Sequence, residues 1–287
     1  MDRVKIIECP RDAMQGIKEF IPTVKKVEYI NSILKAGFDT VDFGSFVSSK
    51  AIPQMTDTIQ VLEGLDLSAT TSKLLAIVAN VRGAQDASAF EEISCLGFPF
   101  SVSETFQLRN TNSSIEESLK RVEEIQDICV RSNKILVVYL SMAFGNPYGD
   151  LWNSEVVIGW AKKLSQLGIK IISLADTIGV SNPESISYLF SSIIPELRQV
   201  EIGAHLHTTP EKWEEKIKAA YGNGCRRFDG AIKGYGGCPM ATDKLTGNMP
   251  TENIINFFKH NAKALMNLNE KHFTEAMLIA QQTFPQH

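Results

Sequence analysis

Several features that mark common protein classes are missing from this sequence of 287 residues. Its 5 cysteines are odd in number, widely spaced and never arranged as Cys-x-x-Cys, so we do not expect a disulfide framework. No apolar run approaches the length that spans a bilayer, which argues against an integral membrane protein. The formal net charge of −4 shows no basic excess, so nucleic acid is not an expected partner.

Targeting signals are missing as well. Residues 1–7 lead directly into a β-rich run, without an apolar signal region or an arginine-rich transit segment. Residues 284–287 match no targeting signal. We therefore expect a cytoplasmic protein with no membrane partner.

Strand-like apolar runs alternate with helix-like amphipathic stretches along the chain. The strand-like runs cover residues 4–8, 40–43, 74–81, 98–102, 135–140, 169–175, 200–207 and 227–232. Helical spacing covers 24–36, 55–65, 84–96, 115–128, 156–167, 210–221, 251–260 and 269–282, with a further helix from 183. The alternation predicts an α/β fold, a TIM (β/α)8 barrel with an additional C-terminal helix. An open Rossmann-like sheet is the alternative, although no Gly-x-Gly-x-x-Gly follows the first strand.

Two helix beginnings are clear from the residues alone. Ser114-Ile-Glu-Glu117 has the pattern of a capping box, and Asn182-Pro183 combines an N-cap residue with a proline in the first turn. We expect one domain over residues 1–287, with the barrel over about 4–262 and a helical extension over about 263–287. Three cysteines are expected to be packing residues within or at the ends of helices: Cys95, Cys129 and Cys225.

Two histidines stand near the end of the seventh predicted strand. His205 and His207 are two residues apart, so in a strand they point to the same side. At the rim of a barrel they could share one divalent metal ion. The alternative is a strand end with two solvated or hydrogen-bonded histidines.

Other polar residues follow the ends of predicted strands, where TIM barrels carry their active sites. Because a barrel closes, Asp12 after the first strand and the loop after the eighth can meet the histidine pair. Two histidines and a carboxylate suit Mg²⁺, Mn²⁺, Fe²⁺ or Zn²⁺, and the amide oxygen of Asn248 would favour the harder ions. Taken singly, Asp12 could begin a turn and Asn248 could cap the helix near Thr251.

An ordered series of motifs resembles a known family. The motifs are Pro10-Arg-Asp-Ala-Met-Gln15, Ser45-Phe-Val-Ser48 with Pro53-Gln-Met55, Ser173-Leu-Ala-Asp-Thr-Ile-Gly179, His205-Leu-His207, Gly234-Tyr-Gly-Gly-Cys-Pro239 and Gly247-Asn-Met-Pro-Thr-Glu252. From about residue 4 to residue 260 they closely resemble the 3-hydroxy-3-methylglutaryl-CoA lyases, in the superfamily of metal-dependent TIM-barrel lyases and Claisen-condensing enzymes. The Gly-Gly-Cys-Pro loop is the part most specific to the lyases.

The resemblance implies reverse Claisen cleavage of 3-hydroxy-3-methylglutaryl-CoA to acetoacetate and acetyl-CoA. It implies Mg²⁺ or Mn²⁺ as cofactor, held by Asp12, His205, His207 and Asn248. Arg11 would bind the substrate and stabilise the enolate, or else form a salt bridge at the barrel rim. Cys238 would protonate the enolate carbon as general acid, or else simply fill a tight loop, and the base would be Asp12 or His205.

Four further positions are implied with less definite roles. Asp42, where the family usually has Glu, and Asp176 would support catalysis or satisfy strand-end amides as structural carboxylates. Glu252 would support the ligands or act as an N-terminal helix acid, and Thr208 stands where the family usually has Asp. Ala13-Met14 replace the usual Gly-Leu, a further departure from the family pattern.

The implied partners are an acyl-CoA substrate and a second copy of the chain, as a homodimer. Arg109 and Lys50 lie in loops suited to the CoA phosphates, or are solvated surface charges. Three other functions stay open: a lyase on a related 3-hydroxyacyl-CoA, a forward Claisen-type acyltransferase, and a non-catalytic barrel that binds a CoA thioester.

Overall fold

Eight parallel strands close into a barrel in the computed structural model, which describes residues 3–68, 70–237, 246–261 and 268–284. The barrel strands are β1 (Lys5–Glu8), β2 (Thr40–Ser45), β3 (Lys73–Ile77), β4 (Ile93–Ser101), β5 (Ile135–Ser141), β6 (Ile171–Ala175), β7 (Glu201–His205) and β9 (Arg227–Gly230). β9 pairs with both β7 and β1, so the ring is complete and the predicted TIM barrel is confirmed.

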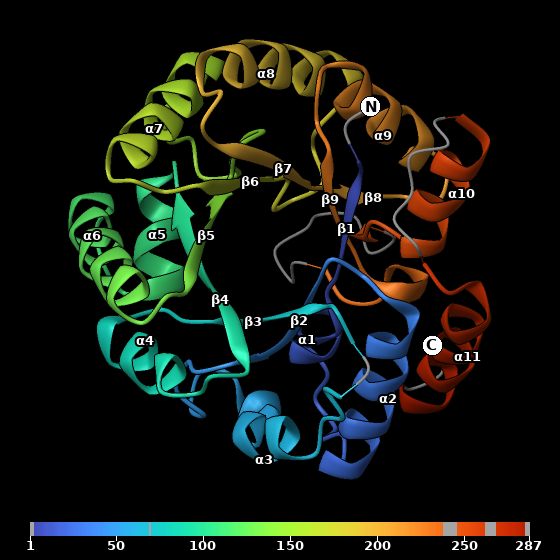
Figure 1. Cartoon of the computed structure of the whole chain (residues 1–287). Helices are drawn as coiled ribbons and strands as arrows, with labels where there is room; N and C mark the ends of the chain where they lie inside the picture. Colours follow the sequence, from blue (N-terminus) through green and yellow to red (C-terminus); the bar gives the residue numbers. More distant parts are fainter. Residues whose placement is uncertain (1–2, 69, 238–245, 262–267, 285–287) are drawn as a thin grey trace.

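Helices surround the barrel (Figure 1). The outer ring contains α2 (Thr23–Ala36), α3 (Thr58–Glu63), α4 (Val81–Ser88), α6 (Ile115–Arg131), α7 (Ser154–Gln166), α8 (Pro183–Glu196), α9 (Trp213–Gly222) and α10 (Thr251–Asn261). The predicted C-terminal helix is α11 (Glu270–Thr283), which lies between α10 and α2 and fills the gap in the ring (Figure 1). Among the described residues, no helix has the length and apolar character needed to cross a membrane.

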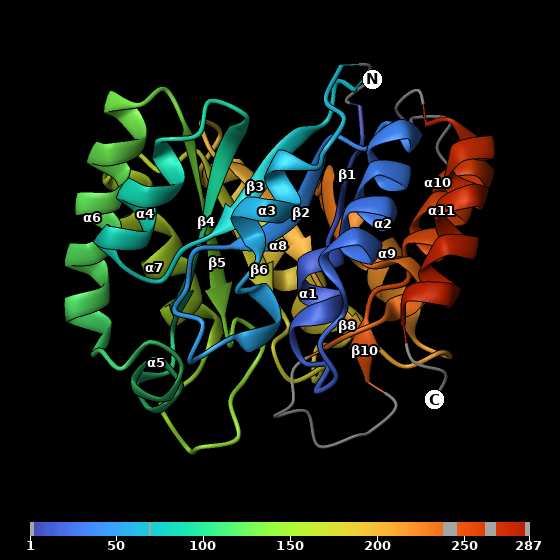
Figure 2. The same ribbon diagram turned by 90° about the horizontal axis from the view of Figure 1, so that it is seen from below.

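Short elements gather at the end of the barrel toward which the strands run (Figure 2). They include α1 (Pro10–Gln15), α5 (Glu104–Thr111) and the antiparallel pair of β8 (His207–Thr208) with β10 (Gly247–Asn248). Two 3-10 turns are also present, η1 (Pro53–Met55) and η2 (Ile232–Gly234). This end carries the carboxyl termini of the strands, where TIM barrels place their active sites.

Both predicted helix beginnings are confirmed. The Ser114 hydroxyl accepts a hydrogen bond from the Glu117 backbone N–H, and the Glu117 carboxylate accepts one from the Ser114 N–H. Asn182 caps α8 by accepting from the Ser185 N–H, with Pro183 in the first turn. These reciprocal bonds satisfy backbone donors that a helix start otherwise leaves without partners.

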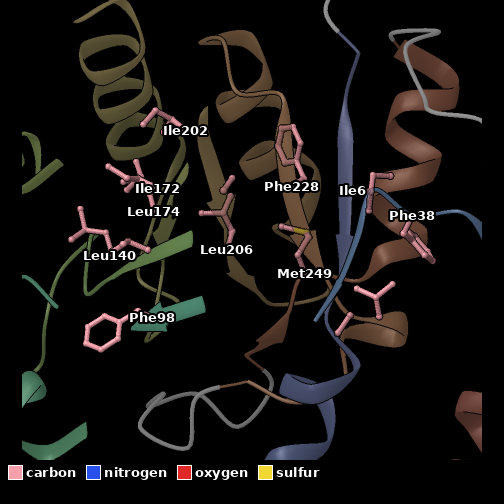
Figure 3. Packing of buried hydrophobic residues seen from close by; sticks show 14 of the residues in the cluster. Ile6, Phe38, Phe98, Leu140, Ile172, Leu174, Ile202, Leu206, Phe228 and Met249 are labelled. Atoms are coloured by element: carbon pink, nitrogen blue, oxygen red, sulfur yellow. The ribbon is translucent and has the colours of Figure 1, made fainter. Parts of the chain in front are cut away.

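The hydrophobic core fills the layer between strands and helices. Alternate residues of successive strands point outward into it, among them Phe98, Leu140, Leu174 and Phe228 (Figure 3). The residues in between face the barrel interior. On β3, β4 and β5 these inner positions are apolar or weakly polar: Leu75, Ile77, Cys95, Val137 and Tyr139. On β2, β6, β7 and β9 they include Asp42, Ser173, His205, Arg227 and Asp229, so one wall of the interior is polar.

Several local expectations are wrong, including the strand predicted over 74–81, which ends at Ile77, and the loop predicted around Arg109, which is α5. The predicted helix over 84–96 ends at Ser88, and Cys95 lies instead in β4, paired with both β3 and β5. Apolar residues at a spacing of three suggested a helix there, but pairing with two neighbouring strands decides the conformation. Cys225 lies in the turn between α9 and β9, while Cys129 is in α6 as expected. The strand predicted over 200–207 is two strands, β7 and β8, separated by Leu206.

Glu8 provides a test of the packing between β1 and α10. Its buried carboxylate accepts hydrogen bonds from the Ile232 N–H and the Thr251 hydroxyl, yet burial raises its pKa from 4.5 to about 8. The folded state therefore holds this proton more tightly than the unfolded chain does. The stabilisation is complete below the ordinary pKa of 4.5 and is lost as the pH rises toward about 8.

We expect Glu8→Gln, which imitates the protonated form, to remove this pH dependence. The free energy of unfolding of the wild type should fall relative to that of Glu8→Gln by a few kcal/mol between pH 4.5 and about 8. Urea denaturation of both proteins across this range measures the difference. A constant difference between the two proteins would contradict the assignment.

Candidate metal centre and active site

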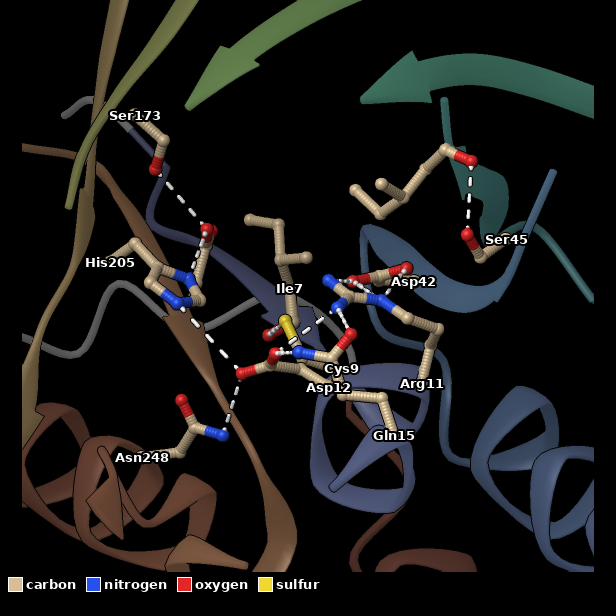
Figure 4. A network of polar contacts seen from close by, with 12 residues as sticks. Ile7, Cys9, Arg11, Asp12, Gln15, Asp42, Ser45, Ser173, His205 and Asn248 are labelled. Atoms are coloured by element: carbon tan, nitrogen blue, oxygen red, sulfur yellow. Dashed lines mark hydrogen bonds and ion pairs between the residues drawn. The ribbon is translucent and has the colours of Figure 1, made fainter. Parts of the chain in front are cut away.

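The end of β1 and the start of α1 place Arg11 and Asp12 next to each other on the polar wall. The Arg11 guanidinium donates from Nε and Nη2 to Asp42 on β2, with Nη2 and Oδ2 separated by 2.5 Å. Its Nη1 donates to Asp12 at 3.1 Å and to Gln15 at 2.8 Å (Figure 4). These bonds account for the Nε–H, one Nη2–H and both Nη1–H. One Nη2–H therefore remains for another acceptor.

Electrostatics keep this group charged. Burial alone would lower the pKa of Arg11, but the carboxylates of Asp42 and Asp12 raise it. Burial also raises the pKa of Asp42 to about 6 against the opposing charge of Arg11. For Asp12, burial acts upward, but Arg11 and the two histidines outweigh it and lower the pKa. At neutral pH the site therefore contains a fixed cation between two carboxylates.

His205 stands opposite Asp12. Its Nδ1 is 3.1 Å from Oδ2 of Asp229, an oxygen that also accepts from the Ser173 hydroxyl. Its Nε2 is 4.0 Å from Oδ2 of Asp12 (Figure 4). Burial would lower the pKa of His205, but the hydrogen bond and charge of Asp229 raise it. Asp229 thus fixes the ring orientation and directs Nε2 toward Asp12.

His207 is the clearest indication of a ligand. It is only 4% exposed, and neither ring nitrogen has a hydrogen-bond partner among the described residues. Burial, together with the neighbouring His205, lowers its pKa to about 4, so the ring is neutral and keeps a free lone pair. A buried ring without partners is costly unless something binds it, and a metal ion would do so.

Asn248 completes the group. Its Nδ2 donates to Oδ2 of Asp12 at 2.8 Å and to the Tyr235 carbonyl at 2.9 Å, and no donor among the described residues engages Oδ1, which can act as a ligand. The antiparallel pairing of β8 and β10 sets Asn248 directly opposite His207. One ligand atom each from Asp12, His205 and His207 lies within 4.8 Å of the others. Two ligand bonds of about 2.1 Å can span the 4.0 Å between Nε2 of His205 and Oδ2 of Asp12, so these residues fit a divalent ion.

The glycine-rich loop after β9 passes against α1. A Cβ at Gly236 would stand 2.7 Å from the Asp12 carbonyl oxygen and 2.8 Å from Cα of Ala13, and its φ is +81°. Only glycine fits both conditions. Tyr235 in the same loop stacks on Phe284, with ring centroids 4.4 Å apart, so the end of α11 supports the loop. Cys238 lies outside the described residues.

The remaining predicted site residues are placed around this group. Asp176 accepts from Ser181 and from Lys216, whose ammonium also donates to the His207 carbonyl, so it supports β8 from behind. Glu252 accepts from the Lys233 N–H and holds the turn η2. The Thr208 hydroxyl donates to the neighbouring Thr209 carbonyl.

The positions of Arg109 and Lys50, the residues suggested for binding the CoA phosphates, do not indicate a phosphate site. The Arg109 guanidinium lies 4.7 Å from the centroid of the Tyr148 ring, and Lys50 is exposed.

Three residues of the site, Asp229, Gln15 and Gly236, were not predicted to have a role there. Asp229 is an acidic residue in the eighth predicted strand, at a position that alternation places toward the barrel interior. An inward carboxylate could have indicated a role in the site. Gln15 lies one helical turn from Arg11, a spacing at which side chains meet on one face. Gly236 gave no signal beyond the glycine run itself, because its neighbours come from α1.

Comparison with known proteins agrees with this geometry. A group of potential metal ligands at the carboxyl ends of barrel strands is typical of a TIM-barrel enzyme. The chain matches the HMGL-like family over residues 3–279 and belongs to this metal-dependent family.

Individual relatives are similar over most of the chain. A curated relative, the cytoplasmic 3-hydroxy-3-methylglutaryl-CoA lyase of Rattus norvegicus, is 35% identical over 88% of this chain and 73% of its own length. The crystal structure of the HMG-CoA lyase from Brucella melitensis superimposes with a TM-score of 0.90 and 26% identity, over 98% of this chain and 99% of the other. An HMG-CoA lyase from Acinetobacter baumannii, in complex with coenzyme A and 3-methylmalate, has a TM-score of 0.88 and 27% identity, over 98% and 91%. The family resemblance stated from the motifs is thereby confirmed.

Asp229 provides a test of how His205 is oriented. Asp229→Asn should weaken Mn²⁺ binding about 10- to 100-fold, because it removes the carboxylate that fixes the ring. Calorimetric titration of metal-stripped protein measures this affinity, with His207→Ala as the variant that removes a candidate ligand outright. Ser173→Ala, which leaves the Asp229 carboxylate in place, is the control and should bind nearly as well as the wild type. Unchanged affinity in a folded Asp229→Asn protein would contradict the role.

Proposed function

We propose that this protein is a metal-dependent carbon–carbon lyase that cleaves 3-hydroxy-3-methylglutaryl-CoA to acetoacetate and acetyl-CoA. One observation carries the proposal. It is the convergence of Asp12, His205, His207 and Asn248 beside Arg11. Asp12, His205, His207 and Asn248 offer ligands for one ion, and the guanidinium of Arg11 keeps one N–H that can donate to a substrate. Membership of the HMGL-like family supports the same reaction.

The candidate ligands favour Mg²⁺ or Mn²⁺, because two of the four donors are oxygens and none is sulfur. A divalent ion held there supplies a Lewis acid that lowers the free-energy cost of an alkoxide at the tertiary hydroxyl of the substrate. Asp229 and the pairing of β8 with β10 hold the ligand side chains in place before the ion binds.

The candidate base is Asp12. A neutral imidazole has one lone pair, so His205 cannot ligate an ion through Nε2 and accept a proton there at the same time. Asp12 has two carboxylate oxygens: Oδ2 faces His205 and Asn248, and Oδ1 accepts hydrogen bonds from Arg11 and Gln15, one of which would be given up when Oδ1 takes the proton. Its lowered pKa makes it a weak base, which suffices once the acidity of the hydroxyl is increased.

Arg11 is placed to act on the other half of the substrate. As the alkoxide collapses to the ketone, the carbon–carbon bond breaks and the acetyl-CoA fragment leaves as an enolate. The remaining Nη2–H of Arg11 can donate to the thioester oxygen that carries the developing charge. Asp42, Asp12 and Gln15 keep the guanidinium from turning away. Cys238 would then protonate the enolate carbon.

The other proposals follow from the same resemblance. The substrate class is an acyl-CoA, and the Acinetobacter relative binds coenzyme A. We propose a single domain whose barrel spans about residues 4–262, because α11 packs on α2 through the hydrogen bond from Asn269 to the Ala36 carbonyl. A cytoplasmic location, supported by the name of the rat relative, and a homodimer are likewise proposals.

Acetoacetate release from 3-hydroxy-3-methylglutaryl-CoA tests the function. Metal-stripped protein should release little, and added Mg²⁺ or Mn²⁺ should restore release by several orders of magnitude, since Lewis-acid stabilisation of the alkoxide is lost without an ion. No release from metal-loaded protein would contradict this substrate and favour another acyl-CoA. Failure both to bind metal and to release product would favour a non-catalytic barrel.

Cys238→Ala tests the general acid. It should lower kcat about 100-fold, because a positioned proton donor contributes about that much, and leave Mn²⁺ affinity nearly unchanged. Cys129→Ala, at a buried cysteine within α6, is the control. Near-normal turnover of Cys238→Ala would refute its role.

A further inference from the structure

A second group of potential ligands lies on the polar wall of the barrel interior. Cys9 follows β1, His205 ends β7, and Asp229 lies on β9. One ligand atom from each lies within 4.8 Å of the others. Cys9 has the same strand parity as Ile7 and so faces the interior. Figure 4 shows Cys9 grouped with Asp12 and His205 at the end of β1.

Two of these residues have unused bonding capacity. Asp229 is only 3% exposed, and its buried Oδ1 has no hydrogen-bond partner among the described residues. The Cys9 sulfur, on a residue 1% exposed, has only a long 3.9 Å contact to the Ile7 carbonyl. Arg227 offsets the charge of Asp229 but leaves Oδ1 without a donor. A buried carboxylate oxygen without a donor is unfavourable, and a bound cation would satisfy it.

We propose that Cys9, His205 and Asp229 form a second metal site, for thiophilic or borderline divalent ions such as Zn²⁺, Co²⁺ and Cd²⁺. The chemistry differs from that of the Asp12 group, because this set contains a sulfur ligand, and sulfur selects softer ions than Mg²⁺. Binding forms a metal–thiolate bond and releases the thiol proton to solvent. His205 contributes one lone pair and stays neutral, with its proton on the other ring nitrogen.

The two sites exclude each other. His205 belongs to both groups, and a neutral imidazole has one lone pair to give. An ion bound to Cys9 and Asp229 through His205 therefore removes a ligand from the Asp12 group. A soft ion would then inhibit the protein by weakening the binding of Mg²⁺ or Mn²⁺, and this consequence rests on the proposed function.

Co²⁺ is the probe, because a cobalt–thiolate bond gives a charge-transfer band that nitrogen and oxygen ligands do not. The full-length protein is stripped of metal and carries Cys238→Ala, so that the loop cysteine cannot supply the thiolate. We expect a thiolate-to-cobalt band with about one equivalent of Co²⁺, and its loss in Cys9→Ser. Cys95→Ser, a buried cysteine on the apolar wall, is the matched control and should keep the band. Binding of Co²⁺ without the band, or a band that survives in Cys9→Ser, would overturn the proposal.

A second experiment distinguishes Cd²⁺ binding at the Cys9 site from direct replacement of Mn²⁺ by Cd²⁺ at the Asp12 site. Electron paramagnetic resonance follows free Mn²⁺ as Cd²⁺ is added. We expect Cys9→Ser to require at least about 10-fold more Cd²⁺ than the wild type, since a lost ligand costs affinity of that order. Equal requirements would mean that Cd²⁺ replaces Mn²⁺ directly, against the proposal. Neither measurement uses turnover, so a failure of the lyase assay does not affect them.

Discussion

The hydrogen bond between Asp229 and Nδ1 of His205 is the contact on which the rest of the site depends. It decides which nitrogen of the ring faces Asp12, and so whether a lone pair is available on that side. Asp229 is buried beside Arg227, whose charge makes it possible to keep a carboxylate within the barrel. Ser173 donates to the same carboxylate oxygen and limits its rotation. The ring of His205, at the rim of the barrel, is thus oriented by charges placed inside it.

Barrel closure makes this arrangement possible. β9 pairs with β7 on one side and β1 on the other, so Asp229 stands between His205 and the start of α1. Mainly apolar inner residues on β3, β4 and β5 occupy the opposite wall, where the buried Tyr139 hydroxyl has no hydrogen-bond partner among the described residues. The interior is therefore divided between a wall that stabilises the fold and a wall that orients the site.

Much of the fold and the ligand group could be predicted because their signals are local. The pair His205 and His207, the capping box at Ser114 and the repeated strand–helix pattern each occupy a short stretch of chain. The failures were non-local. The apolar spacing around Cys95 suits a helix, which is why a helix was predicted there. The residue lies in a strand because β4 pairs with β3 and β5, which are distant in sequence.

The roles of inward residues were harder still to predict. Nothing in the residues around Asp229 indicates that His205, 24 positions earlier, would be its partner. The separation of β7 from β8 also required knowledge of β10, which contributes Asn248 from beyond the glycine-rich loop. Family motifs supplied this long-range information for Asn248 and not for Asp229 or Cys9.

The stacking of Tyr235 on Phe284 has a consequence for synthesis on the ribosome. The loop that approaches Asp12 is held by the last turn of α11, and α11 packs on α2 near the start of the chain. Contacts between such distant segments form late, since they require closure of a loop that includes most of the polypeptide. A nascent chain can therefore assemble strands and outer helices while its metal-binding end is still incomplete. The support that Phe284 gives to this loop can form only after α11 has left the exit tunnel.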